Sequence, residues 1–84
     1  MIKYKFDKKL NRVIAYSEDI VIGMCEYVVK DNYWNIIHTQ IDKMYQGKGI
    51  ARDLVNEVIL NANKNNKKVI ADCSYAKMII KNNG

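Results

Sequence analysis

The sequence contains no proline, and it has only two cysteines and one histidine among its 84 residues. Cys25, His38 and Cys73 are too few for a structural zinc site, and the two cysteines do not form a Cys-x-x-Cys pair. We therefore expect no bound metal. In a reducing compartment both thiols stay free, so each needs an explanation in packing or in chemistry.

Long apolar runs are also missing, and the first residues lack the apolar stretch of a signal peptide. These absences predict a cytoplasmic protein that makes no contact with a membrane. Fourteen Lys and Arg residues against nine Asp and Glu give a net charge of +5. The excess favours an anionic partner, and it leaves nucleic acid, an acidic surface and a phosphorylated cofactor open.

The hydrophobic pattern predicts a single α+β domain over residues 1–84. Four stretches rich in β-branched and aromatic residues are joined by short polar turns, which predicts an antiparallel meander of strands. These strands cover residues 2–6, 12–17, 20–30 and 33–42. Apolar residues three and four apart then predict an amphipathic helix over residues 50–62. A short strand over residues 68–72 completes a β-α-β crossover, and residues 74–82 form a C-terminal helix. At this length the core is thin, which makes a homodimer plausible.

Gly47 and Gly49 lie where the fourth strand gives way to the helix. Backbone N–H groups and the positive end of the helix dipole meet at such a junction, and glycine lets the chain approach a phosphate closely. A dinucleotide fingerprint needs glycine where Arg52 stands, and a P-loop needs Ser or Thr directly after Lys48. Both are excluded. An anion site remains, with a tight turn that binds nothing as its alternative.

In this context the sequence resembles the Gcn5-related N-acetyltransferase superfamily, whose cofactor loop has Gln or Arg, two residues, Gly, one residue, then Gly or Ala. Gln46, Gly49 and Ala51 fill these places in order. Residues 26–75 further resemble a small one-domain branch of that superfamily. The branch has a His-Thr strand and a Cys after the next strand, here Ile37-His38-Thr39-Gln40-Ile41 and Asp72-Cys73-Ser74-Tyr75.

The resemblance implies a GNAT-like fold that binds acetyl-coenzyme A. The pyrophosphate would rest on the amides from Gly47 to Ala51, and the pantetheine arm would lie along the fourth strand, which splays from the strand ending at Asp72. Lys48 and Arg52 would neutralise phosphates. The implied cofactor-binding residues are Thr39, Gln40, Ile41, Gln46, Gly47, Lys48, Gly49, Ile50, Ala51, Arg52 and Ser74.

His38 and Cys73 are the candidate catalytic residues. Histidine is the residue type that exchanges a proton near neutral pH, so His38 is the natural proton acceptor for the amine. Cys73 follows the fifth strand and is expected across the splay from His38, where a thiolate would permit an acetyl-cysteine intermediate. The alternatives are a packed or half-exposed histidine and a small buried cysteine.

Two functions from different classes follow. The first is an enzyme that transfers the acetyl group of acetyl-coenzyme A to an amine. The second is a module that holds acetyl-coenzyme A or coenzyme A without turnover. The C-terminal strands that close over the acceptor in longer members of the superfamily have no counterpart in this sequence, which favours the second. A small basic nucleic-acid binder is a third interpretation, and no RNA-binding sheet motif supports it.

Overall fold

The computed structural model describes residues 1–83, which form five strands, one short 3-10 helix and two α-helices. The sequence predicted the order of the strands and of both α-helices, and their bounds agree within one or two residues. The 3-10 helix was not predicted. In chain order the elements are β1 (Ile2–Asp7), β2 (Arg12–Ser17), β3 (Ile20–Val29), β4 (Tyr33–Ile41), η1 (Lys43–Tyr45), α1 (Ile50–Lys64), β5 (Lys68–Ala71) and α2 (Ser74–Asn83).

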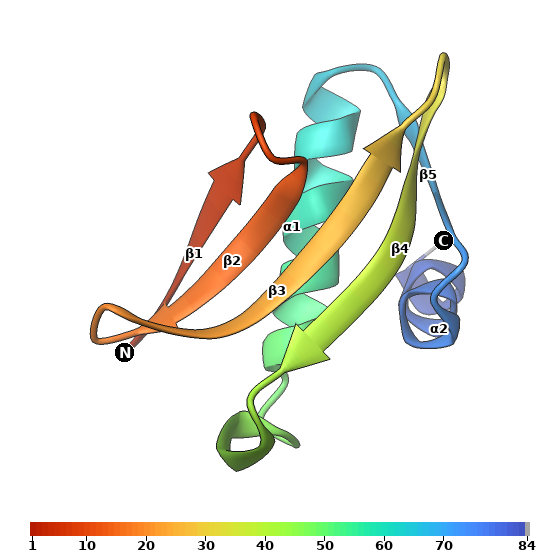
Figure 1. Cartoon of the computed structure of the whole chain (residues 1–84). Coiled ribbons are helices and arrows are strands. Elements are labelled where there is room, and N and C mark those ends of the chain that lie inside the picture. The colour runs from red at the N-terminus through yellow and green to blue at the C-terminus, as the bar shows by residue number, and fades with distance from the viewer. Residues whose placement is uncertain (84) are drawn as a thin grey trace.

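The strands form one sheet in the order β1-β2-β3-β4-β5. β1 to β4 are antiparallel neighbours, and β5 returns after α1 to pair with β4 in parallel (Figure 1). The crossover through α1 is what a parallel pair requires, because a tight hairpin can join only antiparallel strands. This is the α+β architecture, with a meander followed by a β-α-β unit, that the sequence predicted.

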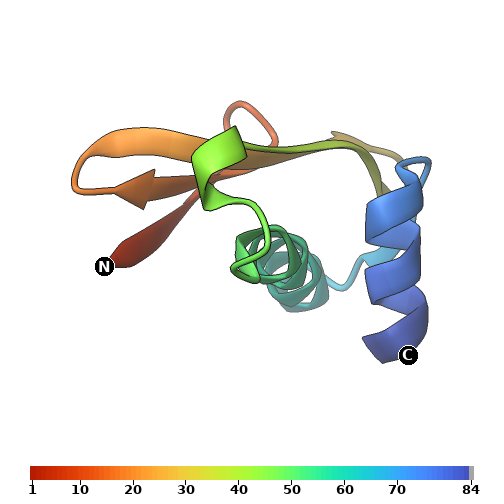
Figure 2. The ribbon, with the colours of Figure 1, turned by 90° about the horizontal axis from the view of Figure 1, so that it is seen from below.

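Both α-helices lie on the same side of the sheet, and within residues 1–83 no helix covers the opposite face (Figure 2). α1 runs across the sheet and buries its apolar face against it, through residues such as Leu54, Val55 and Val58. α2 packs beside β5 and closes the end of the core with Ala76 and Ile79. The opposite face of the sheet is called the open face below.

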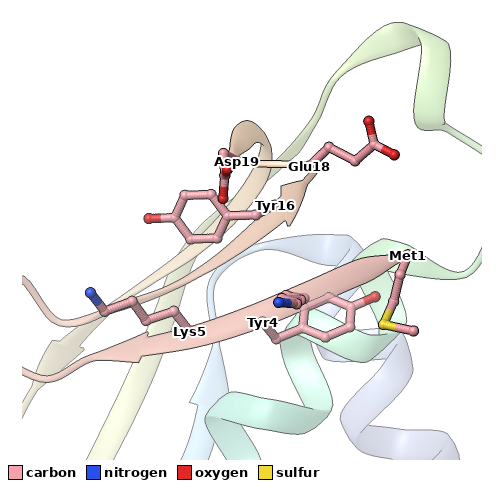
Figure 3. Close-up of a pocket in the computed structure, with 7 residues that line it drawn as sticks. Met1, Tyr4, Lys5, Tyr16, Glu18 and Asp19 are labelled. Carbon is pink, nitrogen blue, oxygen red and sulfur yellow. The ribbon is translucent and has the colours of Figure 1, made fainter.

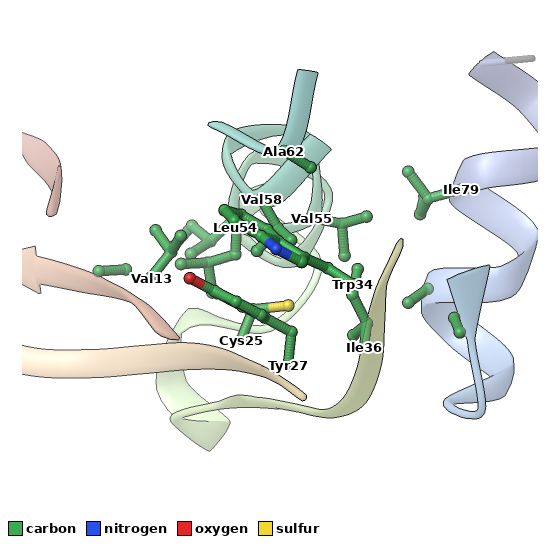
Figure 4. Packing of buried hydrophobic residues seen from close by; sticks show 14 of the residues in the cluster. Val13, Cys25, Tyr27, Trp34, Ile36, Leu54, Val55, Val58, Ala62 and Ile79 are labelled. Carbon is green, nitrogen blue, oxygen red and sulfur yellow. The ribbon is translucent and has the colours of Figure 1, made fainter. Parts of the chain in front are cut away.

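Aromatic side chains from three strands fill the middle of the core. The rings of Tyr27 on β3 and Trp34 on β4 stack with their centroids 4.3 Å apart, and Phe6 on β1 lies 6.0 Å from Trp34. Figure 4 shows Tyr27 and Trp34 lying between the sheet and the apolar face of α1. Stacked pairs contribute about 0.5–1.5 kcal/mol beyond the burial of their surface, so this cluster fixes the packing of α1 on the sheet.

An extra residue interrupts the pairing of β3 with β4. Glu26 lies opposite His38, whereas the next residue of β3, Tyr27, lies opposite Ile36, so Ile37 has no partner. A bulge of this kind reverses which side chains point to which face. Before it, Trp34 and Ile36 are buried against α1; after it, Thr39 and Ile41 occupy that side.

The buried hydroxyl of Tyr27 generates a prediction about stability. This oxygen has no hydrogen-bond partner among the described residues, and burial, with Asp7 nearby, raises the pKa of Tyr27 to about 12. Removing the hydroxyl in Tyr27→Phe should raise the free energy of unfolding by about 1 kcal/mol, because the unpaired group no longer has to be buried. Urea unfolding measures the change, and a loss of stability at neutral pH would contradict the packing described here.

The same substitution should alter the response to alkali. Tyr27 has a pKa of 10.0 as a free side chain and about 12 in the fold, so the unfolded chain loses this proton first. Its contribution is complete below pH 10 and is lost as the pH rises toward 12. The unfolding free energy of Tyr27→Phe should therefore fall less steeply over that interval than that of the parent chain.

Candidate functional site

β4 and β5 part halfway along β4. Their pairing runs from Tyr33 with Lys68 to Ile36 with Ala71 and goes no further, although β4 continues to Ile41. At the parting point the C=O of Ile36 accepts from the N–H groups of both Asp72 and Cys73, at 3.0 and 3.3 Å. The edge of β4 beyond Ile36 is thus free of β5, and this opening is called the splay below.

Backbone groups of β4 point into the splay. The N–H of Asp42 donates to the C=O of Ile22 on β3 at 2.7 Å, so it faces away from the splay. Successive N–H groups of a strand alternate in direction, so that of Ile41, like that of Thr39, faces the splay. The C=O of Ile41 already accepts from the side chain of Gln46, at 3.4 Å. Gln46 therefore ties the following loop to the strand end.

The glycine loop enters α1 through two left-handed residues. Gly47 and Gly49 both have φ +81°, a conformation in which L side chains are strained, although a Cβ on either would meet no atom within 4 Å. Glycine is needed here for the backbone angle and also leaves the surface bare. Gly49 is the N-cap, and the first helical bond runs from the N–H of Asp53 to its C=O at 3.1 Å. The N–H groups before Asp53 lie at the helix N-terminus, where such groups lack intrahelical acceptors.

Side-chain contacts hold this end of α1 in place. The Tyr4 hydroxyl donates to the Asp53 carboxylate at 2.7 Å and joins β1 to the first turn. Burial and this hydrogen bond raise the pKa of Tyr4, so the hydroxyl keeps its proton and stays a donor. The hydroxyl of Tyr45 in η1 donates to Ser17 at 3.3 Å. The glycine loop is therefore held at both of its ends, by the contact of η1 with β2 and by the contact of α1 with β1.

The free strand edge and the glycine loop border one cleft of about 420 Å³. Most of the cofactor-binding residues predicted from the sequence line it, together with one that was not predicted, Tyr75. The lining residues are Thr39, Ile41, Gln46, Gly47, Gly49, Ile50, Ala51 and Tyr75. Tyr75 comes from the first turn of α2. It stands beside Ser74 in the motif quoted for the resemblance, which was the available signal.

The other predicted cofactor residues lie around the cleft rather than in its wall. Lys48 is exposed between the two glycines, and Ser74 begins α2. Arg52 borders an adjacent cavity of about 360 Å³, which shares Tyr75 with the cleft. Gln40 points to the open face, where its side chain lies 3.3 Å from the ring of His38.

Cys73 contacts Thr39. The Cys73 thiol lies 3.9 Å from the Thr39 hydroxyl, which also donates to the buried thiol of Cys25 at 3.6 Å. Neighbouring residues of a strand point to opposite faces, so His38 points away from the two thiols that contact Thr39. Among the contacts of residues 1–83, the side chain of His38 meets Gln40 and not Cys73. The expected thiol–imidazole pair is therefore not formed, and the bulge at Ile37 is the reason.

Cys25 has a packing role. It is fully buried, and burial raises the pKa of its thiol to about 11, with the hydrogen bond from Thr39 acting in the opposite direction. The thiol therefore stays protonated. Within residues 1–83, no three acidic, histidine or cysteine side chains gather as a metal site would require. No helix in the same part of the chain is long and apolar enough to span a membrane.

A larger cavity than the cleft lies elsewhere, at the edge of the sheet formed by β1 and β2. It measures about 650 Å³ and is bordered by β1, β2 and the turn after β2 (Figure 3). Lys5, Tyr16, Glu18 and Asp19 are among the residues that line it. No residue of the glycine loop or the splay contributes to it, so size alone does not identify the functional site.

A meander, a crossover helix behind a glycine loop and a splayed strand pair define the acetyltransferase class of fold. The family described as GCN5-related N-acetyl-transferase matches residues 12–84. The chain belongs to this family, whose members use acetyl-coenzyme A. No curated protein sequence matches the chain significantly.

Solved structures agree with this assignment. A GCN5-like protein from Staphylococcus aureus is 29% identical, with a TM-score of 0.72, and the match covers 96% of this chain and 79% of that one. A "probable acetyltransferase" of unknown function from methicillin-resistant Staphylococcus aureus is 16% identical, with a TM-score of 0.73 over 100% of this chain and 90% of that one.

One solved structure, of a protein longer than this chain, contains acetyl-coenzyme A. It is described as a "predicted acetyltransferase" from Clostridium acetobutylicum with acetyl-coenzyme A, and it is 15% identical with a TM-score of 0.66; the match covers 87% of this chain and 55% of that one. Other long acetyltransferases match in the same way, and the chain spans about half of their length, 47% and 53% in two cases. At this identity the likeness concerns the fold.

Proposed function

We propose that this chain binds acetyl-coenzyme A in the cleft between β4 and the glycine loop and transfers the acetyl group to an amine. The observation that carries the proposal is that a free strand edge and a helix N-terminus open on the same cleft. An extended chain of amides, such as pantetheine, can pair with the strand edge as an added strand does. A pyrophosphate suits the amides of the helix N-terminus.

The glycine loop fits a phosphate group in two ways. The positive φ of Gly47 and Gly49 turns the backbone at this point, and the missing Cβ atoms leave it uncovered. Lys48 adds a cation between them, and Arg52 borders the next cavity along α1 together with Tyr75. Phosphates beyond the pyrophosphate would meet Arg52 there, while the ring of Tyr75 offers a surface to an aromatic base.

The proposed reaction needs an oxyanion donor, a proton acceptor and a proton donor. The amine nitrogen attacks the thioester carbonyl carbon, the new C–N bond forms, and the C–S bond breaks. The N–H of Ile41 in the splay is suited to stabilise the oxyanion. His38 is suited to take the proton that the amine loses, and the departing thiolate takes one from Cys73 or from water. The amine would then approach from the open face, where His38 lies.

The binding step is tested by calorimetric titration with acetyl-coenzyme A. The parent chain should bind, and Gly49→Asp should weaken binding about tenfold or more, because it places a carboxylate among the amides that face the phosphates. Asp tolerates the left-handed conformation better than most residues, so the fold should persist. The matched control is Asn32→Asp in the exposed turn between β3 and β4, which should bind as the parent does.

Absence of any heat with the parent chain would reject both coenzyme functions. A nucleic-acid binder would then become the leading interpretation of the net charge of +5.

Turnover is tested by measuring free thiol release from acetyl-coenzyme A over a panel of amines. His38→Ala should lower kcat about a hundredfold or more, since a positioned proton acceptor contributes on that order. Its dissociation constant for acetyl-coenzyme A should stay unchanged, because His38 does not face the cleft. Equal kcat values in the two chains would show that His38 does not take the proton.

Cys73 defines a covalent alternative. In that route the Cys73 thiolate attacks the thioester, releases coenzyme A, and passes the acetyl group to the amine afterwards. Incubation with acetyl-coenzyme A should then add one acetyl group by intact mass, and Cys73→Ala should abolish it. Cys25 offers an internal comparison, because its buried, protonated thiol should not react. An unmodified parent chain would leave direct transfer as the only route.

A binding module without turnover is the second candidate, and one observation favours it. Within the described part of the chain no element covers the open face, so an acceptor there would be poorly shielded from water. This candidate predicts the same calorimetric binding of acetyl-coenzyme A with no amine-dependent thiol release.

A further inference from the structure

β1 is an edge strand with one unpaired side. It pairs with β2, and among residues 1–83 no strand pairs with its other side. Every second N–H and C=O group of such a strand points away from the sheet and can bond a further strand. The edge belongs to the six residues of β1 and lies across the sheet from the splay (Figure 1). It is therefore a surface to which another extended chain can add.

The side chains of β1 alternate between apolar and cationic. Ile2, Tyr4 and Phe6 are partly buried and pack against the core on the helix side of the sheet. Lys3 and Lys5 lie between them and are exposed on the open face. In strand addition the main chain supplies the hydrogen bonds and the alternating side chains select the partner. A strand that adds here must offer apolar groups on one face and a carboxylate on the other.

The cavity beside β1 carries charges of both signs. Lys3 and Lys5 line it, and so do Glu18 and Asp19 of the turn between β2 and β3 (Figure 3). A uniformly acidic strand would be repelled by the two carboxylates, and a uniformly basic strand by the two lysines. The edge therefore favours a partner strand whose charge changes sign along its length.

β1 itself meets this description. Its last residue, Asp7, is a carboxylate, and Lys8 and Lys9 follow in the exposed turn to β2. Two copies related by a two-fold axis run antiparallel, so the end of one β1 lies beside the start of the other. The acidic turn, Glu18 and Asp19, lies at the start of β1. The two lysines of one copy thus approach the acidic turn of the second copy.

One register suits the side chains that face each other in such a pair. With Lys5 opposite its own counterpart, Lys3 lies opposite Asp7 and Tyr4 lies opposite Phe6, each of them twice. Opposite charges and aromatic rings stabilise a cross-strand pair, whereas like charges weaken it. The single Lys5 pair is therefore outweighed by two charge pairs and two aromatic pairs.

Other registers are less favourable. A shift by two residues in one direction would place Lys3 opposite Lys5 in both halves, and a shift in the other direction would shorten the pairing to residues 5–7. A shift by one residue would bring side chains of opposite faces together. Lysines on an edge strand commonly prevent unspecific pairing. Here they leave one register open, the one in which Lys3 meets Asp7.

We infer that two copies of this chain associate through β1, antiparallel and with Lys5 on the two-fold axis, so that one sheet continues across the dimer. A six-residue edge is small beside the interfaces of stable complexes. The dimer should therefore be weak, with a dissociation constant on the order of 10–100 μM. None of the residues that line the cleft lies on β1, so both clefts stay open and the inference is independent of the proposed function.

The first test is sedimentation equilibrium together with NMR of the isotope-labelled chain at increasing concentration. The parent chain should pass from monomer to dimer between about 5 μM and about 1 mM, with amide shifts confined to β1 and the two turns beside it. A chain that stays monomeric would overturn the inference and leave the edge to a different extended chain. Shifts centred on the exposed Ile37 and Ile70 would overturn it too, because they would indicate stacking of two open faces.

Charge reversal tests the register. Lys3→Glu and Asp7→Lys should each weaken the dimer about tenfold or more, because an attractive pair becomes repulsive in both halves. Mixed in equal amounts, the two variants should form a heterodimer about as tight as the parent dimer, since residues 3 and 7 again carry opposite charges in each pair. Two folded variants that do not associate on mixing would overturn the inference.

A second variant at residue 7 guards against a folding defect. The Asp7 carboxylate accepts from the N–H of Leu10 at 3.2 Å, and Asp7→Lys removes this contact. Asp7→Asn keeps an acceptor at that place and removes the charge alone, so it should fold and still dimerise more weakly than the parent. A dimer unchanged in both Asp7→Asn and Lys3→Glu would overturn the inference.

Two further variants complete the set. Lys5→Thr should tighten the dimer about two- to fivefold, because it removes the one repulsive pair. The matched control is Lys77→Glu, at an exposed lysine of α2, which should dimerise as the parent does. All variants should bind acetyl-coenzyme A as the parent does. Loss of the dimer with binding retained rejects only the β1 inference, and a dimer that does not bind acetyl-coenzyme A rejects only the proposed function.

Discussion

The extra residue in β4 determines the geometry of the whole site. Without the bulge at Ile37, His38 and Gln40 would continue the inward pattern of Trp34 and Ile36 and would point at α1. With it, Thr39 and Ile41 take the inner positions. The cost is one unpaired, half-exposed isoleucine at the place where the two strands part. As a result, Thr39 and Ile41 lie on the helix side of β4 beside its free edge, and His38 lies on the open face.

The strand parting and the glycine loop lie at the two ends of the free edge of β4. The C=O of Ile36 accepts two N–H groups of the chain leaving β5, which ends the pairing cleanly. At the other end of the free edge, Gln46 occupies the C=O of Ile41 and holds the loop that Gly47 and Gly49 turn into α1. The cleft is therefore bounded by hydrogen bonds at both ends, and the backbone groups left between them are those that a substrate can use.

The fold could be predicted from the sequence because each element carries its own local pattern. The helix of α1 follows from Leu54, Val55 and Val58 at helical spacing, and the cofactor loop follows from glycines at a strand-to-helix junction. The relation of His38 to Cys73 could not be predicted. It depends on Ile37, which has no partner on β3. The sequence of β4 does not by itself indicate whether a bulge forms there. Tyr75 was missed as a lining residue for a related reason, since the chain reaches the cleft only after β5 has parted from β4.

The separation of His38 from Cys73 also bears on how an acetyl group would travel. Cys73 lies beside Thr39, on the cleft side of β4, whereas His38 and Glu26 lie on the open face. A covalent route would need the acetyl-cysteine to meet an amine whose proton acceptor is on the other side of the strand. Direct transfer needs only that the thioester reach the splay from one side and the amine from the other, with the Ile41 N–H between them. In the proposed reaction, the strand alternation that separates His38 from Cys73 thus favours direct attack by the amine, and Cys73 would only donate a proton to the departing thiolate.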